Sequence, residues 1–247
     1  MDHSFQTQVL IIGGGATGTG LARDLALRGI QSILTEKGDI NAGASGGNHG
    51  LLHSGARYVS TDPAVAAECR AENELLKKLA PHCIEETGGL FVAVAGDDET
   101  YVADFPHLCE RAGIPATLLD IQDARELEPV LSPDTIAVYQ VEDASIDPFK
   151  LSLENMAQAQ ALGSRLLRHT QLMGFTMGRS SIRSALLQDI KTGEEMVIDP
   201  EMVVNAAGAW AGEVAALAGL SIQILYSKGS LLVTDRRITR RIINRLR

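Results

Sequence analysis

The hydrophobic pattern at the start of the chain predicts a strand, a helix and a second strand. The apolar run 9–12 is short, rich in β-branched residues and followed by glycine, which is typical of a buried parallel strand. Apolar positions then recur at helical spacing over 16–28, and Gly29 is a suitable C-terminal cap. A second apolar strand at 32–35 ends at Glu36. This order predicts a parallel α/β sheet.

Helical and strand patterns alternate along the rest of the chain. Further helices are expected over 62–80, 98–112, 123–127, 149–162 and 209–217. Strands are expected over 89–94, 116–119, 136–141, 196–198 and 202–204, on both sides of the turn at 178–181, and as a bent pair at 222–234. A β-meander inserted in an α/β frame is typical of the larger flavin folds rather than of NAD dehydrogenases.

Composition and charge exclude several classes of function. With 247 residues, of which 45% are hydrophobic, the chain can form one or two domains with a substantial core. A net charge of −9 disfavours a nucleic acid partner. We expect neither a transmembrane segment nor a signal peptide, because no apolar run approaches ~20 residues and the N-terminus lacks the charged-then-apolar pattern. Three cysteines without C-x-x-C spacing predict reduced thiols and no metal site.

A dinucleotide-binding fingerprint lies between the first strand and the first helix. Gly13, Gly15 and Gly18 have G-x-G-x-x-G spacing, and Glu36 follows 18 residues after the last of them. A carboxylate at this position accepts hydrogen bonds from ribose hydroxyls and repels a 2′-phosphate, which favours FAD or NAD over NADP. The alternative is a glycine-rich turn in an ordinary α/β protein.

Two further segments have the composition of a ligand site. Residues 37–58 combine several glycines with Ser, Asn and His, which suits a backbone that lies against a flat polar ligand. A mobile surface loop is the alternative, although His49, His53, Arg57 and Tyr58 are more than a linker needs. The small-residue turn at 205–208 would let a cofactor approach the backbone closely, and a tight core crossover would explain it nearly as well.

These segments together resemble the FAD-dependent glycerol-3-phosphate dehydrogenases, and most closely the A subunits of the anaerobic bacterial enzymes. The motifs that carry the resemblance are IIGGGATGTGLARDLALRG, GGNHGLLHSGARY, DASIDPFKL, VVNAAGAWA and KGSLL. The resemblance implies an α/β protein with a glutathione-reductase-type (Rossmann-like) FAD-binding domain and an inserted antiparallel-sheet substrate domain. Their expected bounds are 1–90 and 145–220 for the FAD-binding domain, and 91–144 and 221–247 for the substrate domain. Family members continue through a later glycine-rich stretch, so the fold is expected to be C-terminally incomplete.

The resemblance also implies roles for individual residues. The residues that would bind FAD are Gly13, Gly15, Ala16, Thr17, Gly18, Glu36, Lys37, Gly43, Ala44, Ser45, Asn48, His49, Gly50, Leu52, Ala207, Gly208 and Trp210. The catalytic candidates are His49, His53 and Arg57, and the substrate-binding candidates are Arg57, Tyr58 and Lys228. Arg57 is suited to a phosphate because a guanidinium can form two parallel hydrogen bonds with it. A surface salt bridge remains the alternative for Arg57, as does a structural role for either histidine, and Trp210 more often packs than reacts.

The implied function is the FAD-dependent oxidation of sn-glycerol 3-phosphate to dihydroxyacetone phosphate in glycerol metabolism and anaerobic respiration. Electrons would pass to partner subunits and then to quinone, which places the protein in the cytoplasm or peripherally on the inner face of the cell membrane. Two alternatives stay open. The chain could be part of a related flavin oxidoreductase acting on a 2-hydroxy acid or an amine, or an inactive truncated FAD-binding fragment.

Overall fold

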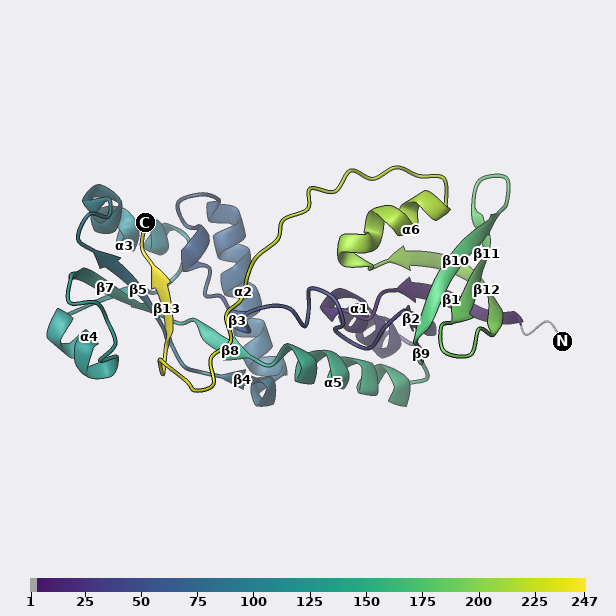
Figure 1. Cartoon of the computed structure of the whole chain (residues 1–247), viewed down its shortest axis with the longest axis horizontal. Coiled ribbons are helices and arrows are strands. Elements are labelled where there is room, and N and C mark those ends of the chain that lie inside the picture. The colour runs from purple at the N-terminus through teal and green to yellow at the C-terminus, as the bar shows by residue number, and fades with distance from the viewer. Residues whose placement is uncertain (1–3) are drawn as a thin grey trace. The chain divides into compact units, whose positions relative to one another are not determined.

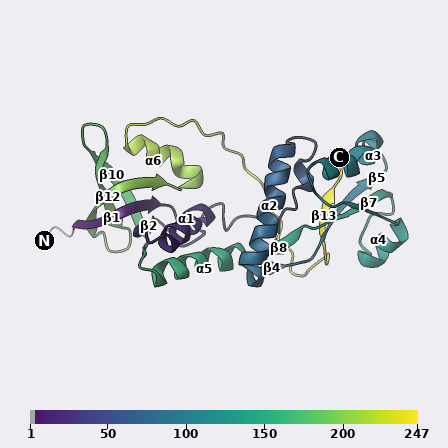
Figure 2. The same ribbon diagram turned by 180° about the vertical axis from the view of Figure 1, so that it is seen from behind.

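The computed structural model describes residues 4–247, which form two compact units. Among the described residues, unit 1 comprises 4–48 and Pro148–Ser230, and unit 2 comprises His49–Asp147 and Leu231–Arg247. Both are discontinuous in sequence, and Figure 1 labels their elements, with the reverse view in Figure 2. Residues 49–90, expected in the FAD-binding domain, lie in unit 2. The division into an FAD-binding and a substrate domain stays a prediction, because compactness alone does not assign a function.

Unit 1 is built on a six-stranded sheet with the order β10-β11-β12-β1-β2-β9. Its strands are β1 (Ser4–Ile12), β2 (Ser32–Glu36), β9 (Arg165–Arg168), β10 (Thr170–Met177), β11 (Ile182–Asp189) and β12 (Glu195–Asn205). Its helices are α1 (Ala16–Leu27), α5 (Pro148–Ala161), α6 (Ala211–Leu217) and the 3₁₀ turn η3 (Gly208–Trp210). Strands β12, β1, β2 and β9 run parallel, whereas β10, β11 and β12 form an antiparallel meander.

Helices cover both faces of this sheet (Figure 1), with α1 and α5 on one face and α6 on the other. Alternate residues of β1 point to opposite faces. Ile11 packs in a core with Ala22 of α1 and Met156 of α5. Its neighbour Leu10 packs in a second core that includes Val214 of α6. Burial on both faces explains why β1 is a continuous apolar run rather than an alternating one.

Unit 2 contains a four-stranded sheet, β13-β5-β7-β6, and a small three-stranded sheet, β3-β8-β4. Its strands are β3 (Leu51–Leu52), β4 (Ile84–Glu85), β5 (Gly89–Val94), β6 (Thr117–Leu119), β7 (Thr135–Val141), β8 (Ala144–Ile146) and β13 (Ile242–Arg245). Its helices are α2 (Pro63–Leu79), α3 (Glu99–Arg111), α4 (Ile121–Leu127) and the 3₁₀ turns η1 (Ala56–Tyr58) and η2 (Pro81–Cys83). The main core is aromatic, because Phe105 of α3 packs between Phe91 and Tyr139 of the larger sheet.

The predicted helices agree with the observed ones to within two residues at either end, but two strand predictions need correction. The strands expected at 196–198 and 202–204 are one strand, β12. Pro200 does not interrupt it, because β11 pairs with β12 only as far as Ile198. The N–H that proline lacks is therefore not needed by that neighbour.

The bent strand pair predicted at 222–234 is wrong. The structure has an extended segment there that forms no strand, and no strand among residues 4–247 pairs with it. Leu225, Leu232 and Val233 are each at least 95% exposed. An apolar alternating pattern indicates a tendency to form a strand, but a strand needs a partner for its backbone hydrogen bonds.

Candidate functional site

Two glycines of the fingerprint, Gly13 and Gly18, are required by backbone packing in the first turn of unit 1, and Gly15 lies close to a side chain. Gly13 has φ +111°, and a Cβ there would lie 2.5 Å from the carbonyl oxygen of Ala206. A Cβ on Gly18 would lie 1.9 Å from the carbonyl oxygen of Gly13. Gly15 is the N-cap of α1, and a Cβ there would lie 2.9 Å from Ser45 Oγ. The turn therefore presents bare backbone at the start of a helix, an arrangement that favours a phosphate ligand.

The carboxylate of Glu36 closes this turn at the end of β2. One oxygen accepts a hydrogen bond from the backbone N–H of Gly14 and the other accepts one from Gly38, both at 2.7 Å. Each carboxylate oxygen can accept a second bond. Both oxygens of Glu36 can therefore also accept hydroxyl donors such as the 2′- and 3′-OH of a ribose.

A cavity of about 490 Å³ extends from this turn within unit 1. The residues predicted to bind FAD that line it are Gly13, Gly15, Thr17, Glu36, Lys37, Gly43, Ala44, Ser45, Ala207, Gly208 and Trp210. Ala16, Gly18 and Asn48 belong to unit 1 but do not line the cavity, although the N–H of Ala16 is bonded to Ser45 Oγ at 2.9 Å. His49, Gly50 and Leu52 lie in unit 2.

The lining of the cavity includes a cation–π pair. Lys37 Nζ lies 4.0 Å from the ring centroid of Trp210. A Cβ on Gly43 would lie 3.1 Å from the same indole, so this glycine lets the ring pack against the backbone. Trp210 is the single tryptophan of the chain, which makes it a specific reporter of this cavity.

Sequence reasoning missed one wall of the cavity. Residues 170–173 of β10 line it, and Thr35 Oγ1 donates a hydrogen bond to the carbonyl oxygen of Thr170 at 2.7 Å. Nothing in the local sequence marks these residues. Their place follows from the order of the strands, which no spacing pattern records.

The cavity of unit 1 fits the ADP half of a dinucleotide. It has a side-chain-free turn at a helix N-terminus for the pyrophosphate and a carboxylate with free acceptor capacity for a ribose. The turn follows the carboxyl end of β1, and Glu36 lies at the carboxyl end of the adjacent parallel strand β2. Open α/β sheets bind their ligands at the carboxyl ends of their strands.

Unit 2 brings most of the catalytic and substrate candidates together. The ring centroid of His53 lies 5.9 Å from that of His49 and 5.7 Å from that of Tyr58. Arg57 precedes Tyr58 in η1, is exposed, and forms no ion pair with any residue in 4–247. Lys228, the remaining substrate candidate, is exposed in the extended segment of unit 1.

His53 has an environment that favours the neutral imidazole. Burial lowers the pKa of His53, the charges of His49 and Arg57 lower it further, and the carboxylate of Asp143 acts in the opposite direction. The Nδ1 of His53 is buried and has no hydrogen-bond partner within residues 4–247. A neutral imidazole with an unused nitrogen can accept a proton from a ligand.

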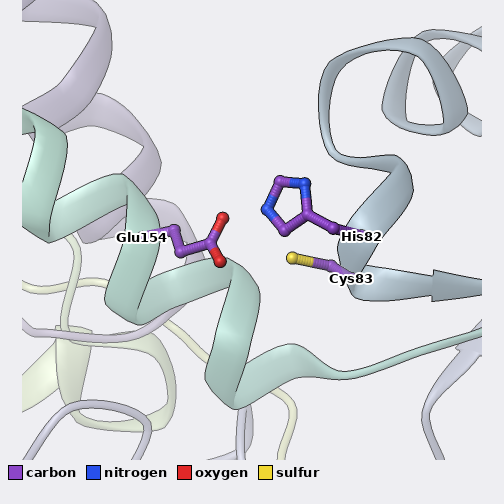
Figure 3. A group of neighbouring side chains, drawn as sticks. All are labelled: His82, Cys83 and Glu154. Carbon is purple, nitrogen blue, oxygen red and sulfur yellow. The ribbon is translucent and has the colours of Figure 1, made fainter.

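A histidine, a cysteine and a glutamate have side chains of the kind that bind metal ions. They lie outside the cavity of unit 1 and outside the group formed by His49, His53 and Tyr58. Figure 3 shows His82 and Cys83 from η2 and Glu154 from α5. The first two belong to unit 2 and Glu154 belongs to unit 1, and we assign no metal to them.

Comparison with protein families and curated sequences gives consistent matches. The family model described as FAD dependent oxidoreductase matches residues 8–246. The chain is 45% identical, over 99% of its length, to the A subunit of the anaerobic glycerol-3-phosphate dehydrogenase of Escherichia coli (strain K12), of which it covers 45%. It is 40% identical, over 97% of its length, to the A1 subunit of the enzyme of the same name from Haloferax volcanii, of which it covers 42%. The chain thus spans less than half the length of these relatives.

Solved structures of two dehydrogenases share the fold of this chain. L-proline dehydrogenase from P. horikoshii superposes with a TM-score of 0.78 at 25% identity, covering 90% of this chain and 58% of that one. The glycerol-3-phosphate dehydrogenase from Bacillus halodurans, complexed with FAD, superposes with a TM-score of 0.62 at 25% identity, covering 83% of this chain and 35% of that one. In the part of the chain that the structure describes, no helix is long and apolar enough to cross a membrane.

Proposed function

Because this chain belongs to the FAD dependent oxidoreductase family, we propose that it binds FAD and takes part in the oxidation of sn-glycerol 3-phosphate to dihydroxyacetone phosphate. The observation that supports this choice of substrate is the exposed guanidinium of Arg57 beside His53, in a chain 45% identical to a glycerol-3-phosphate dehydrogenase subunit. FAD, when bound, supplies the acceptor for the two electrons and the hydrogen that leave C2 of the alcohol.

The residues of unit 1 hold the cofactor in this proposal. The backbone of the turn at Gly13 and Gly15 binds the pyrophosphate, and Glu36 accepts hydrogen bonds from the ribose. Lys37 and Trp210 border the same cavity. The segment 43–48 continues along the cofactor.

The residues of unit 2 act on the substrate. Arg57 and Tyr58 bind its phosphate, which fixes the position of the alcohol and raises its effective concentration. The oxidation releases the hydroxyl proton, and neutral His53 accepts it at an imidazole nitrogen. His49 is the alternative acceptor. Lys228 belongs to unit 1 and stays a substrate-binding candidate from the sequence.

Partner subunits that take the electrons on to quinone complete the proposal. The relative from Escherichia coli is a subunit by name, which supports an assembly of several chains. The place of action proposed here is the cytoplasm or the inner face of the cell membrane, reached through those subunits.

Oxidation of an amine or of a 2-hydroxy acid is the second candidate. The similarity in fold to an L-proline dehydrogenase favours it, since Arg57 could equally bind a carboxylate. Substrate comparison separates the candidates. We expect the FAD band in the visible spectrum of the loaded protein to bleach without oxygen on addition of glycerol 3-phosphate and not on addition of L-proline or lactate. Bleaching by either of the latter alone would contradict the assignment.

The role of Arg57 is tested in the same assay. Arg57→Ala should raise the concentration of glycerol 3-phosphate needed for half-maximal reduction by about tenfold or more, because a charge-assisted contact with the phosphate is lost. Arg111→Ala is the matched control, since it removes another exposed positive charge, at the end of α3. An unchanged half-maximal concentration in Arg57→Ala would remove the phosphate-binding role.

A further inference from the structure

A buried carboxylate of unit 2 lies next to the histidine cluster. Asp143 connects β7 to β8 and is only 1% exposed. Its Oδ1 accepts two hydrogen bonds from Ser54, from the backbone N–H at 2.7 Å and from Oγ at 2.6 Å. Its Oδ2 accepts one from Asn244 Nδ2 at 3.0 Å. A buried carboxylate is costly unless it is well bonded, so these three bonds fix Asp143 firmly and, with it, the residue that follows His53.

Helix α2 supplies a second buried contact, to the peptide unit that joins His53 to Ser54. Asn73 is fully buried, and its Nδ2 donates to the carbonyl oxygens of Leu52 and His53 at 3.2 and 3.1 Å. The peptide unit between His53 and Ser54 is therefore bonded at both of its polar atoms by buried side chains. Its carbonyl accepts from Asn73 and its N–H donates to Asp143.

The chain turns sharply immediately after this peptide unit. Gly55 has φ +96°, and a Cβ there would lie 2.1 Å from the carbonyl oxygen of Ala66 in α2. The imidazole of His53, by contrast, makes ring contacts with His49 and Tyr58 but leaves its buried Nδ1 without a partner in residues 4–247. The orientation of the ring thus depends on the backbone that carries it.

We propose that Asp143 is a positioning residue, which acts through Ser54 and together with Asn73 to hold His53 in the orientation that faces the substrate alcohol. This inference rests on the proposed function, because only there does His53 act as the proton acceptor. Because the imidazole is already held in place, substrate binding does not incur the entropic cost of ordering it. The placement of the ring itself can be measured without turnover.

The charges around His53 allow positioning to be separated from a simple structural role. The groups that act on the imidazole are Asp143, which raises its pKa, and His49 and Arg57, which lower it, while burial is the largest cause and lowers it. Tyr58 is the other titratable group that faces the ring. Loss of the Asp143 charge and loss of the loop conformation therefore move the pKa of His53 in opposite directions.

The test is an NMR titration of the His53 imidazole in the FAD-loaded protein, with its signal assigned by its absence in His53→Gln. Asp143→Asn keeps an acceptor for Ser54 and removes the charge, so the pKa of His53 should fall. Asp143→Ala removes the same charge but also releases the loop and lets water reach the ring, and because burial is the larger cause, the pKa of His53 should lie above its value in Asp143→Asn. The Ser54 amide should also exchange about tenfold faster. Asp97→Asn, which removes a carboxylate paired with Arg245 in the same unit, should change neither.

A His53 titration that is unchanged in both Asp143 variants would overturn the proposal. If Asp143→Ala does not fold, Asn73→Ala replaces it, because it frees the carbonyl of His53 and keeps the charge of Asp143. A pKa of His53 and an exchange rate of the Ser54 amide that both stay unchanged would sink the idea. Turnover adds an independent readout, because Asp143→Ala should lower kcat with glycerol 3-phosphate about tenfold or more while the KM, which depends on Arg57, stays within about twofold. If glycerol 3-phosphate reduces the FAD of no variant, the proposed function fails. The NMR titration of His53 still tests the role of Asp143 in that case.

Discussion

At the scale of single residues, two glycines of helix α1 that are two positions apart have opposite surroundings. A Cβ on Gly18 would lie 1.9 Å from the carbonyl oxygen of Gly13, whereas a Cβ on Gly20 would meet no atom within 4 Å. Gly18 is therefore needed for the close approach of helix and turn. Gly20 only increases the conformational freedom of the unfolded chain and lowers helix propensity.

This contrast makes a matched pair of variants. Gly18→Ala should destabilise unit 1 by roughly 1–3 kcal/mol or more, because the turn at Gly13 must move. Gly20→Ala should stabilise it by up to about 1 kcal/mol, because alanine favours the helix. Urea denaturation of the two variants measures both effects. Equal effects of the same sign would mean that the turn does not pack as described.

What the sequence reveals at this scale depends on whether the constraint is local. The glycine spacing and Glu36 could be recognised because a tight turn and the strand after it follow directly along the chain. Residues 170–173 could not, since they reach the cavity only through the pairing of distant strands. Asp143 begins the DASIDPFKL motif, but no role was predicted for it, because its partners Ser54 and Asn244 are far from it in sequence.

At the scale of elements, the basic segment that follows residue 234 becomes an ordered edge strand. Glu128, at the end of α4, is 2% exposed, and its carboxylate accepts hydrogen bonds from the backbone N–H groups of Arg240 and Arg241. Strand β13 then runs parallel to β5, and Arg245 pairs with Asp97. A carboxylate that binds consecutive N–H groups fixes where the strand begins.

Removing this carboxylate should loosen β13 selectively. In Glu128→Ala the two partly buried N–H groups lose their acceptor, which costs roughly 1 kcal/mol or more. The amides of Ile242 and Leu246, which bond to Gly88 and Val92, should then exchange with deuterium at least about tenfold faster. Glu126→Ala is the control, since Glu126 is an exposed acid of the same helix. Exchange that is equally slow in both variants would show that Glu128 does not hold the strand.

Element prediction failed where pairing rather than pattern decides. Helices carry their own hydrogen bonds, and their ends agree with the caps and periodicity of the sequence. Strands do not, so the apolar pattern at 222–234 predicted a strand pair that the structure lacks, and the patterns at 196–198 and 202–204 predicted two strands where pairing with β1 makes one. Short strands such as β3 and β8 carried too few residues for a pattern to be seen.

At the scale of the whole molecule, the two units have different chemistry. Unit 1 contains the cavity, the fingerprint turn and the single tryptophan. Unit 2 contains the histidine cluster, Arg57 and the buried network around Asp143. We propose cofactor binding for the first and substrate chemistry for the second, and the first proposal is the central claim because every later step depends on it.

The most direct test is a titration of the protein with FAD in which the fluorescence of Trp210 reports binding. Since this indole borders the cavity, FAD should change its emission in a saturable way. Glu36→Ala should weaken binding about tenfold to a hundredfold, because charged hydrogen bonds to the ribose are lost, while Glu99→Ala on α3 should leave it unchanged. Saturable binding with this difference between the two variants is the predicted result. No change in Trp210 emission and no FAD retained after gel filtration would contradict the assignment of the cavity to FAD.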